Sequence, residues 1–275
     1  MEPAARESRM SLQPLQRRVA NGRKGAVIDL SPGAYGGFIV SREASMTLRG
    51  LGAAPMNVQI VGPCTTSPAL GLKPAIHVDT AVPARIRFEN LAIRNPHGWG
   101  VHAWGQGHVL EFVDCVISST ITYGIWLRGG ASAILVNCTI GPAGELGGTG
   151  ICCEGGASLA MEGCKLHGWE QSGVELSGTA ELECVGSEIS ENGASGLAIS
   201  GKCTTVGLRD CRIVGNGRYD VEVTKARQSI WRRTAMPFRR RRSHETPEWP
   251  AVTGHGNDIG LLSPEMGPWP EDFCR

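Results

Sequence analysis

The sequence predicts an all-β fold, a single-stranded right-handed parallel β-helix of about eight coils with 23–26 residues each. Three observations predict it. One short segment recurs at this spacing, each repeat holds three strands with alternating apolar residues, and Asn, Asp or Gly marks one corner of each repeat. A unit of three short strands cannot bury its own apolar face, so the repeats must stack to form a common core.

The repeat is clearest in a segment that begins with Asn, Asp or Gly and ends with Ile or Leu. This segment is the third strand of the unit. Asn, Asp and Gly tolerate a left-handed backbone, so the first residue of each copy predicts a tight bend. Six copies follow at spacings of 24, 23, 26, 23 and 24 residues, starting at positions 90, 114, 137, 163, 186 and 210. The second position of the copies predicts a buried column: Leu91, Cys115, Cys138, Cys164, Ser187 and Cys211.

The first and second strands of the unit keep the same spacing. The second strand comes just before the bend. The first strand follows a glycine in most copies and alternates apolar with variable residues, which is typical of a strand with one buried face. With two less regular coils at the start, its inward residues give eight rungs: Phe38, Ile76, Val101, Ile125, Ile151, Val174, Leu197 and Val221.

We expect three parts of the chain: an N-terminal segment with a capping helix over residues 1–24, the β-helix over 25–225, and a C-terminal cap with a flexible basic and Pro-rich tail over 226–275. Open ends of a stack expose unpaired strands and need covers. The helix is expected within residues 11–20, where apolar residues have helical spacing. The residues expected to form the two covers are Leu12, Leu15 and Val19 at the front and Ile230, Trp231 and Phe238 at the back.

Composition excludes several classes of protein. The β-helix region carries 13 Lys and Arg against 18 Asp and Glu, which does not favour binding to nucleic acid. No run of 18 apolar residues predicts a membrane span. Ten cysteines without an export signal do not indicate a secreted disulfide scaffold. We therefore expect a cytoplasmic protein, or a nuclear one if the run of arginines at 239–242 is a nuclear localisation signal.

Segments 27–35, 46–50 and 60–62 resemble the entry into the first coils of the right-handed parallel β-helix repeat family, also called the CASH or pectin-lyase-like family. The resemblance covers about residues 25–225. It implies the fold. For activity it implies a choice among pectin-degrading enzymes, mannuronan epimerases and the substrate-binding part of F-box proteins, of which the last is the closest intracellular analogue.

The family resemblance also implies that functional groups lie on the outer face of the first sheet. The outward residues of the first strand are Ile39, His77, His102, Trp126, Cys152, Glu175, Ala198 and Glu222, of which Cys152 is expected to be exposed. A patch of histidine and tryptophan can stack on a sugar ring or hold a peptide. The predicted binding residues are His77, His102, Trp126, Trp104, His97 and Glu175.

Catalytic and metal sites are weaker predictions. Glu175 and Glu222 are two rungs apart, which suits an inverting pair, although isolated surface glutamates are common on strands. Residues 95–98 read Asn-Pro-His-Gly and partly resemble the Asp-Pro-His-Asp signature of mannuronan epimerases, but both acids are missing. No third ligand accompanies the two histidines for a metal. We therefore predict no catalytic residue, metal or cofactor.

The predicted function is a non-enzymatic recognition scaffold that binds a protein or carbohydrate partner along the outer face of the first sheet, and not a membrane. Two alternatives stay open. One is a carbohydrate-active enzyme, a polysaccharide lyase, a hydrolase or an epimerase-like protein. The other is a substrate-receptor fragment of a ubiquitin ligase.

Overall fold

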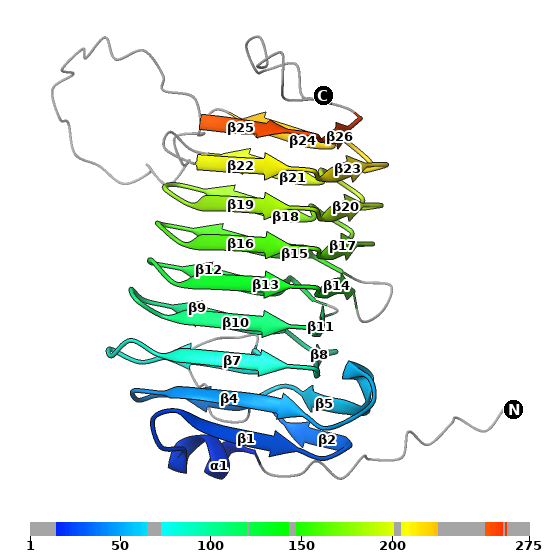
Figure 1. Ribbon diagram of the computed structural model, residues 1–275. Coiled ribbons are helices and arrows are strands. Elements are labelled where there is room, and N and C mark those ends of the chain that lie inside the picture. Colours follow the sequence, from blue (N-terminus) through cyan, green and yellow to red (C-terminus); the bar gives the residue numbers. More distant parts are fainter. Residues whose placement is uncertain are drawn as a thin grey trace, which may run out of the picture.

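The computed structural model describes residues 15–64, 73–119, 121–142, 147–200, 205–224, 251–260 and 262. Three parallel sheets wind around one axis in this part of the chain and form an all-β solenoid (Figure 1). Each coil except the last described one contributes one strand to each sheet, and equivalent strands of successive coils pair in parallel. The predicted fold class is confirmed.

The first sheet holds the eight rungs that the sequence predicts. Inward residues of its strands, such as Val101 and Ile125, are fully buried and stack in register. Its strands are, in order, β3 (Phe38–Val40), β6 (Ile76–Asp79), β9 (Val101–Trp104), β12 (Tyr123–Arg128), β15 (Thr149–Glu154), β18 (Val174–Ser177), β21 (Leu197–Ser200) and β24 (Val221–Thr224).

The second and third sheets have nine strands each among the described residues, and a short 3-10 helix, η1 (Pro55–Asn57), lies before β5. The second sheet contains β1 (Ala26–Leu30), β4 (Ser45–Gly50), β7 (Arg85–Glu89), β10 (Val109–Val113), β13 (Ser132–Val136), β16 (Ser158–Glu162), β19 (Glu181–Val185), β22 (Thr205–Arg209) and β25 (Ala251–His255). The third contains β2 (Gly33–Gly36), β5 (Val58–Val61), β8 (Ala92–Asn95), β11 (Val116–Ser119), β14 (Thr139–Pro142), β17 (Lys165–His167), β20 (Glu188–Ser190), β23 (Arg212–Val214) and β26 (Asp258–Ile259).

The bend between the second and third strands has the predicted left-handed backbone. For example, φ is 52° at Asp114 and 53° at Asn137. The residue that follows each bend is buried, as the repeat predicts: all six members of the column from Leu91 to Cys211 are at most 2% exposed. The thiols of the column are satisfied locally, since the Sγ atom of Cys138 donates to the carbonyl oxygens of Phe112 and Val136 at 3.4 and 3.3 Å.

The glycine before the first strand has a packing reason. A Cβ atom at Gly150 would lie 2.5 Å from the carbonyl oxygen of Gly173 in the next coil, and one at Gly124 would lie 2.7 Å from that of Gly150. Successive coils therefore approach too closely at this corner for a side chain. The repeated glycine in the sequence marks this contact.

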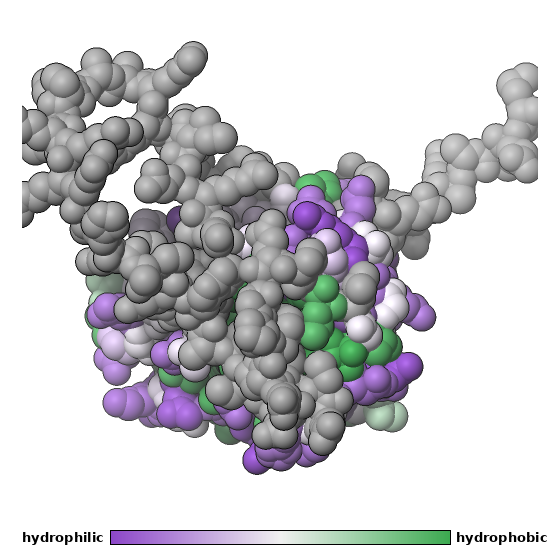
Figure 2. All heavy atoms as spheres, turned by 90° about the horizontal axis from the view of Figure 1, so that it is seen from above, coloured by the Kyte–Doolittle hydropathy of each residue, from purple (hydrophilic) through white to green (hydrophobic). Residues whose placement is uncertain are grey.

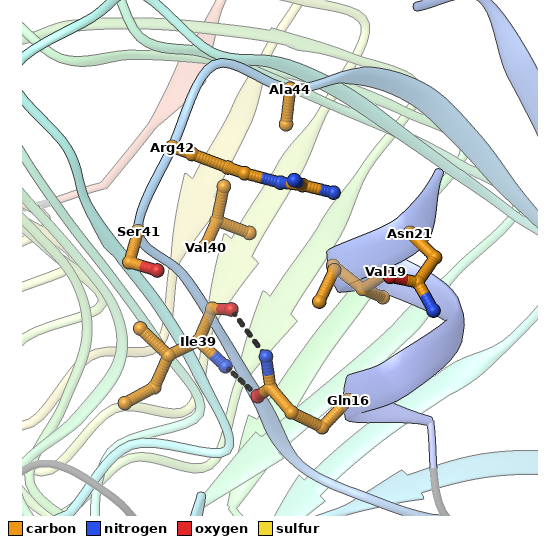
Figure 3. Close-up of a pocket in the computed structure, with 9 residues that line it drawn as sticks. Gln16, Val19, Asn21, Ile39, Val40, Ser41, Arg42 and Ala44 are labelled. Carbon is orange, nitrogen blue, oxygen red and sulfur yellow. Dashed lines mark hydrogen bonds between the residues drawn. The ribbon is translucent and has the colours of Figure 1, made fainter. Parts of the chain in front are cut away.

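A short helix covers the first coil, as predicted, although it is α1 (Gln16–Asn21) and starts later than expected. Leu15 and Val19 are buried beneath it, while residues 1–14 lie outside the described part of the chain. The side chain of Gln16 pairs with the edge strand β3: its Nε2 donates to the Ile39 carbonyl at 3.0 Å, and its Oε1 accepts from the Ile39 N–H at 2.8 Å (Figure 3). This amide takes the place of a neighbouring strand.

The stack continues beyond the predicted boundary at residue 225. Strands β25 and β26 add a further rung to the second and third sheets, where we expected a cap and a loose tail. Gly256, with φ of 67°, and the buried Asn257 repeat the bend and the column position 46 residues after Asp210. The reason is that a long insertion separates this repeat from the one before it, which hides the regular spacing. Residues 225–250, with the predicted cap and the arginine run, lie outside the described residues.

One hydrophobic core runs along the axis. Phe88 and Phe112 stack at 4.9 Å between ring centroids, and the largest buried side chain is Trp169, which the sequence pattern does not single out. Viewed along the stack from the β25 end, a group of hydrophobic residues is visible next to hydrophilic ones (Figure 2). Within the described ranges, no helix has the length and apolarity that a bilayer crossing needs.

Candidate functional site

The outer face of the first sheet carries two columns of side chains. The column that the sequence predicts, from Ile39 to Glu222, lies in register along the sheet. The second column stands two residues further along each strand and was not recognised in the sequence, apart from Trp104. Its members are Asp79, Trp104, Arg128, Glu154, Ser177, Ser200 and Thr224.

The lower half of this face is a packed aromatic cluster. His77 and His102 stack at 4.9 Å, and their Nδ1 atoms are 3.1 Å apart. Trp126 stacks on His102 at 4.7 Å, and Trp99 meets Trp126 edge-on at 4.7 Å. Tyr123 lies 5.3 Å from Trp126. Each of these rings therefore covers part of the surface of its neighbour.

Packing in the cluster buries two predicted binding residues. His77 is 5% exposed and His102 is 2% exposed, although both point away from the core. Burial lowers the pKa of His102 to about 3, with smaller contributions from the charges of His77 and Arg128. Burial also lowers the pKa of His77, against the opposing effect of Asp79. Neither imidazole offers a free surface to a partner in this conformation.

The exposed members of the cluster lie at its edge. Trp104 ends β9 and is 58% exposed, and the Arg128 guanidinium lies over the rings of Trp126 and Trp104 at 4.7 and 5.9 Å. His97 is exposed in the turn after β8, where its N–H donates to the Asn95 side chain at 3.1 Å. Binding through Trp104, Trp126 or His97 stays a prediction.

Cys152 corrects the expectation of an exposed thiol. It points outward from β15 but is only 4% exposed, because Tyr123, Glu154 and Glu175 surround it. Its Sγ atom lies 3.8 Å from Oε1 of Glu154. Burial and the neighbouring carboxylates raise the pKa of the thiol, which disfavours a thiolate nucleophile.

The upper half of the same face is a groove. It has a volume of about 410 Å³ and lies over β15, β18, β21 and β24. The floor of the groove is lowest at Ala198, because this small side chain stands in register between the longer Glu175 and Glu222. The remaining polar residues that line the groove are Glu154, Ser172, Ser177, Ser200, Arg218 and Thr224.

Two of the three carboxylates in the groove are paired with arginine. Glu154 pairs with Arg128 at 3.0 Å. Glu222 pairs with Arg218 at 3.2 Å and accepts a hydrogen bond from the Ser195 hydroxyl at 2.5 Å. Both are thus held in place by neighbours on the same face.

Glu175 differs from these two carboxylates. Its Oε1 accepts a hydrogen bond from the Thr149 hydroxyl at 3.0 Å, and among the described residues no cation pairs with it. Since Ala198 adjoins it on the next rung, Glu175 borders the lowest part of the floor. It is the predicted binding residue that the groove contains.

A second, smaller hollow lies beside the capping helix. It measures about 210 Å³ and lies between α1 and the segment that follows β3 (Figure 3). Its central polar group, the Gln16 amide, is occupied by the backbone of Ile39. We assign this hollow to the N-terminal cap.

Nowhere in the described ranges do three His, Cys, Asp or Glu side chains gather in a way that could hold a metal ion.

Comparison with known proteins identifies the family. A family model described as a right handed beta helix region matches residues 75–232, more than half of the chain. The chain belongs to the right-handed β-helix family. No curated protein matches it.

Three solved structures resemble this β-helix protein. They are YbhC of Escherichia coli (10% identity, 88% of this chain and 79% of that one, TM-score 0.45), the A-module of the mannuronan C-5 epimerase AlgE6 of Azotobacter vinelandii (13%, 88% and 92%, 0.23), and the catalytic unit of a GH87 α-1,3-glucanase of Streptomyces thermodiastaticus (11%, 92% and 67%, 0.21). At these values they add nothing to the family assignment.

Proposed function

We propose that this protein recognises a glycan chain in the groove over β15, β18, β21 and β24. The observation that supports the proposal is the hollow at Ala198, flanked by Glu175 and Glu222. A volume of about 410 Å³ falls in the usual range of ligand sites, roughly 300–1,000 Å³.

The chemistry of the lining favours a sugar over a protein surface. Carboxylates accept hydrogen bonds from sugar hydroxyls, and serine and threonine hydroxyls both accept and donate them; these groups dominate the groove. The centre of a protein interface is usually rich in aromatic residues and depleted in acidic ones. Here the aromatic residues are packed against each other below the groove.

Filling the hollow tests the proposal. We expect Ala198→Trp to lower glycan affinity by about ten-fold or more, because the indole would occupy the ligand's space. Binding is measured on an array of plant, fungal and bacterial oligosaccharides and then by calorimetry.

Ala160→Trp is the matched control, since Ala160 is also a half-buried, outward alanine in the middle of a strand, on the second sheet. It should bind as the wild type does. Equal affinity in both variants, or no glycan bound by the wild type, would refute the proposal.

Hydrolysis of the bound glycan is a second candidate function. Glu175 and Glu222 are two rungs apart in one groove, roughly 9–10 Å by strand spacing, which approaches the separation in inverting hydrolases. A reducing-end assay on every glycan that binds tests it. Hydrolysis is supported if the wild type produces new reducing ends and if Glu175→Gln and Glu222→Gln each abolish this product. Binding without product rejects it.

A further inference from the structure

The charges in the groove do not balance. Glu154 and Glu222 each have an arginine partner, at 3.0 and 3.2 Å, whereas no cation of the described residues pairs with Glu175. One negative charge is therefore left, and it stands beside the lowest part of the floor. A half-buried carboxylate has lost part of its hydration, so it gains more from a cationic donor than from a neutral one.

The contacts of Glu175 fix where such a donor would lie. Thr149 donates to Oε1, which holds the carboxylate and leaves Oε2 without a hydrogen bond from the described residues. On the side of the next coil stands Ala198, whose methyl group leaves the hollow open. An ammonium group of a ligand in the hollow can therefore reach the carboxylate without displacing an arginine.

We infer that the groove selects a glycan that carries a protonated amino group, an amino sugar, with its ammonium on Glu175 and its hydroxyls on the serine and threonine side chains of the lining. The inference rests on the proposed glycan binding. Hydroxyl groups at Ser177, Ser200 and Thr224 are on the second column, next to the carboxylates of the first. This pairing matches a ring that bears both an amine and hydroxyls.

A lysine-rich peptide is the competing source of an ammonium group. A lysine side chain carries four methylene groups, which bind best along an apolar surface. The apolar residues that line the groove offer little surface to such a chain: Ala194 and Ala198 are small, and Leu176, Ile199 and Cys152 are 1%, 1% and 4% exposed. The lining therefore favours the sugar.

The test compares three hexamers by calorimetry: β-1,4-linked glucosamine, its N-acetylated form, and cellohexaose. It is done at about pH 6, below the usual pKa of an amine. We expect the glucosamine hexamer to bind about ten-fold more tightly than the other two, and Glu175→Gln to abolish that difference. Glu183→Gln, an exposed glutamate on the second sheet, should retain it.

Four other results of these binding measurements would overturn the inference. Equal binding of all three hexamers to the wild type, lost in Ala198→Trp, overturns the amino-sugar inference and keeps the glycan proposal. A preference for glucosamine that survives Glu175→Gln also overturns the inference. If a hexalysine peptide binds as tightly as the glucosamine hexamer, the inference of an amino sugar is wrong and the ligand is a lysine-rich peptide. No binding of any hexamer or array glycan rejects both proposals.

Discussion

Replacing Cys138 by Asp is expected to unfold the β-helix under conditions in which the wild-type protein is folded. Cys138 is 1% exposed in the middle of the buried column, and its Sγ atom faces the carbonyl oxygens of Phe112 and Val136. A carboxylate there would meet acceptors rather than donors. The cost of burying such a charge is several kcal/mol, comparable to the whole stability of many domains. Circular dichroism and thermal melting measure it.

Thr139→Asp is the matched control. Thr139 is the next residue, it points outward from β14 and is half-buried, so a carboxylate there can reach water. We expect this variant to melt close to the wild type. A Cys138→Asp protein that also melts like the wild type would show that the column does not lie inside the solenoid.

Acid is expected to destabilise the protein largely through His102. The pKa of His102 is lowered from 6.5 to about 3 in the folded state, mainly by burial. Below pH 6.5 the His102 imidazole is protonated in the unfolded chain but stays neutral in the folded protein until the pH approaches 3. Protonation therefore favours unfolding. The free energy of unfolding should fall by about 3 kcal/mol between about pH 6.5 and about pH 4 from this group alone. His77 acts in the same direction.

Chemical denaturation at several pH values measures this dependence. His102→Gln removes the ionisable group, so its unfolding free energy should change less between neutral and acidic pH than that of the wild type, whatever its absolute stability. His97→Gln removes an exposed histidine instead and should keep the wild-type slope. Identical slopes in the wild type and His102→Gln would mean that another group governs the acid sensitivity.

The repeat made most of the fold predictable, because each coil is specified by a local pattern. A bend residue such as Asp114, a buried residue such as Cys115 and an alternating strand lie within a few positions of each other. Stacking then needs no long-range information beyond the spacing. The pattern fails only where the spacing is interrupted, as before Gly256 and Asn257, which fit the repeat once the insertion is removed.

The candidate site was less predictable, because it depends on segments outside the repeat. The direction of His102 followed from strand alternation, but its burial depends on Trp99, which comes from a turn that shares no pattern with other coils. Likewise, Ala198 between Glu175 and Glu222 is evident from the register. That it forms the floor of a groove depends on flanking side chains such as Arg218, which strand alternation does not place.

The amide of Gln16 has a consequence for the assembly of the rod. Parallel solenoids whose terminal strand is open can add a second molecule to that strand, and head-to-tail addition of this kind does not close but grows into a filament. By occupying both backbone groups of Ile39, Gln16 leaves that position of β3 unable to template another chain. One side chain thus helps to keep a polymerisation-prone architecture at a finite length.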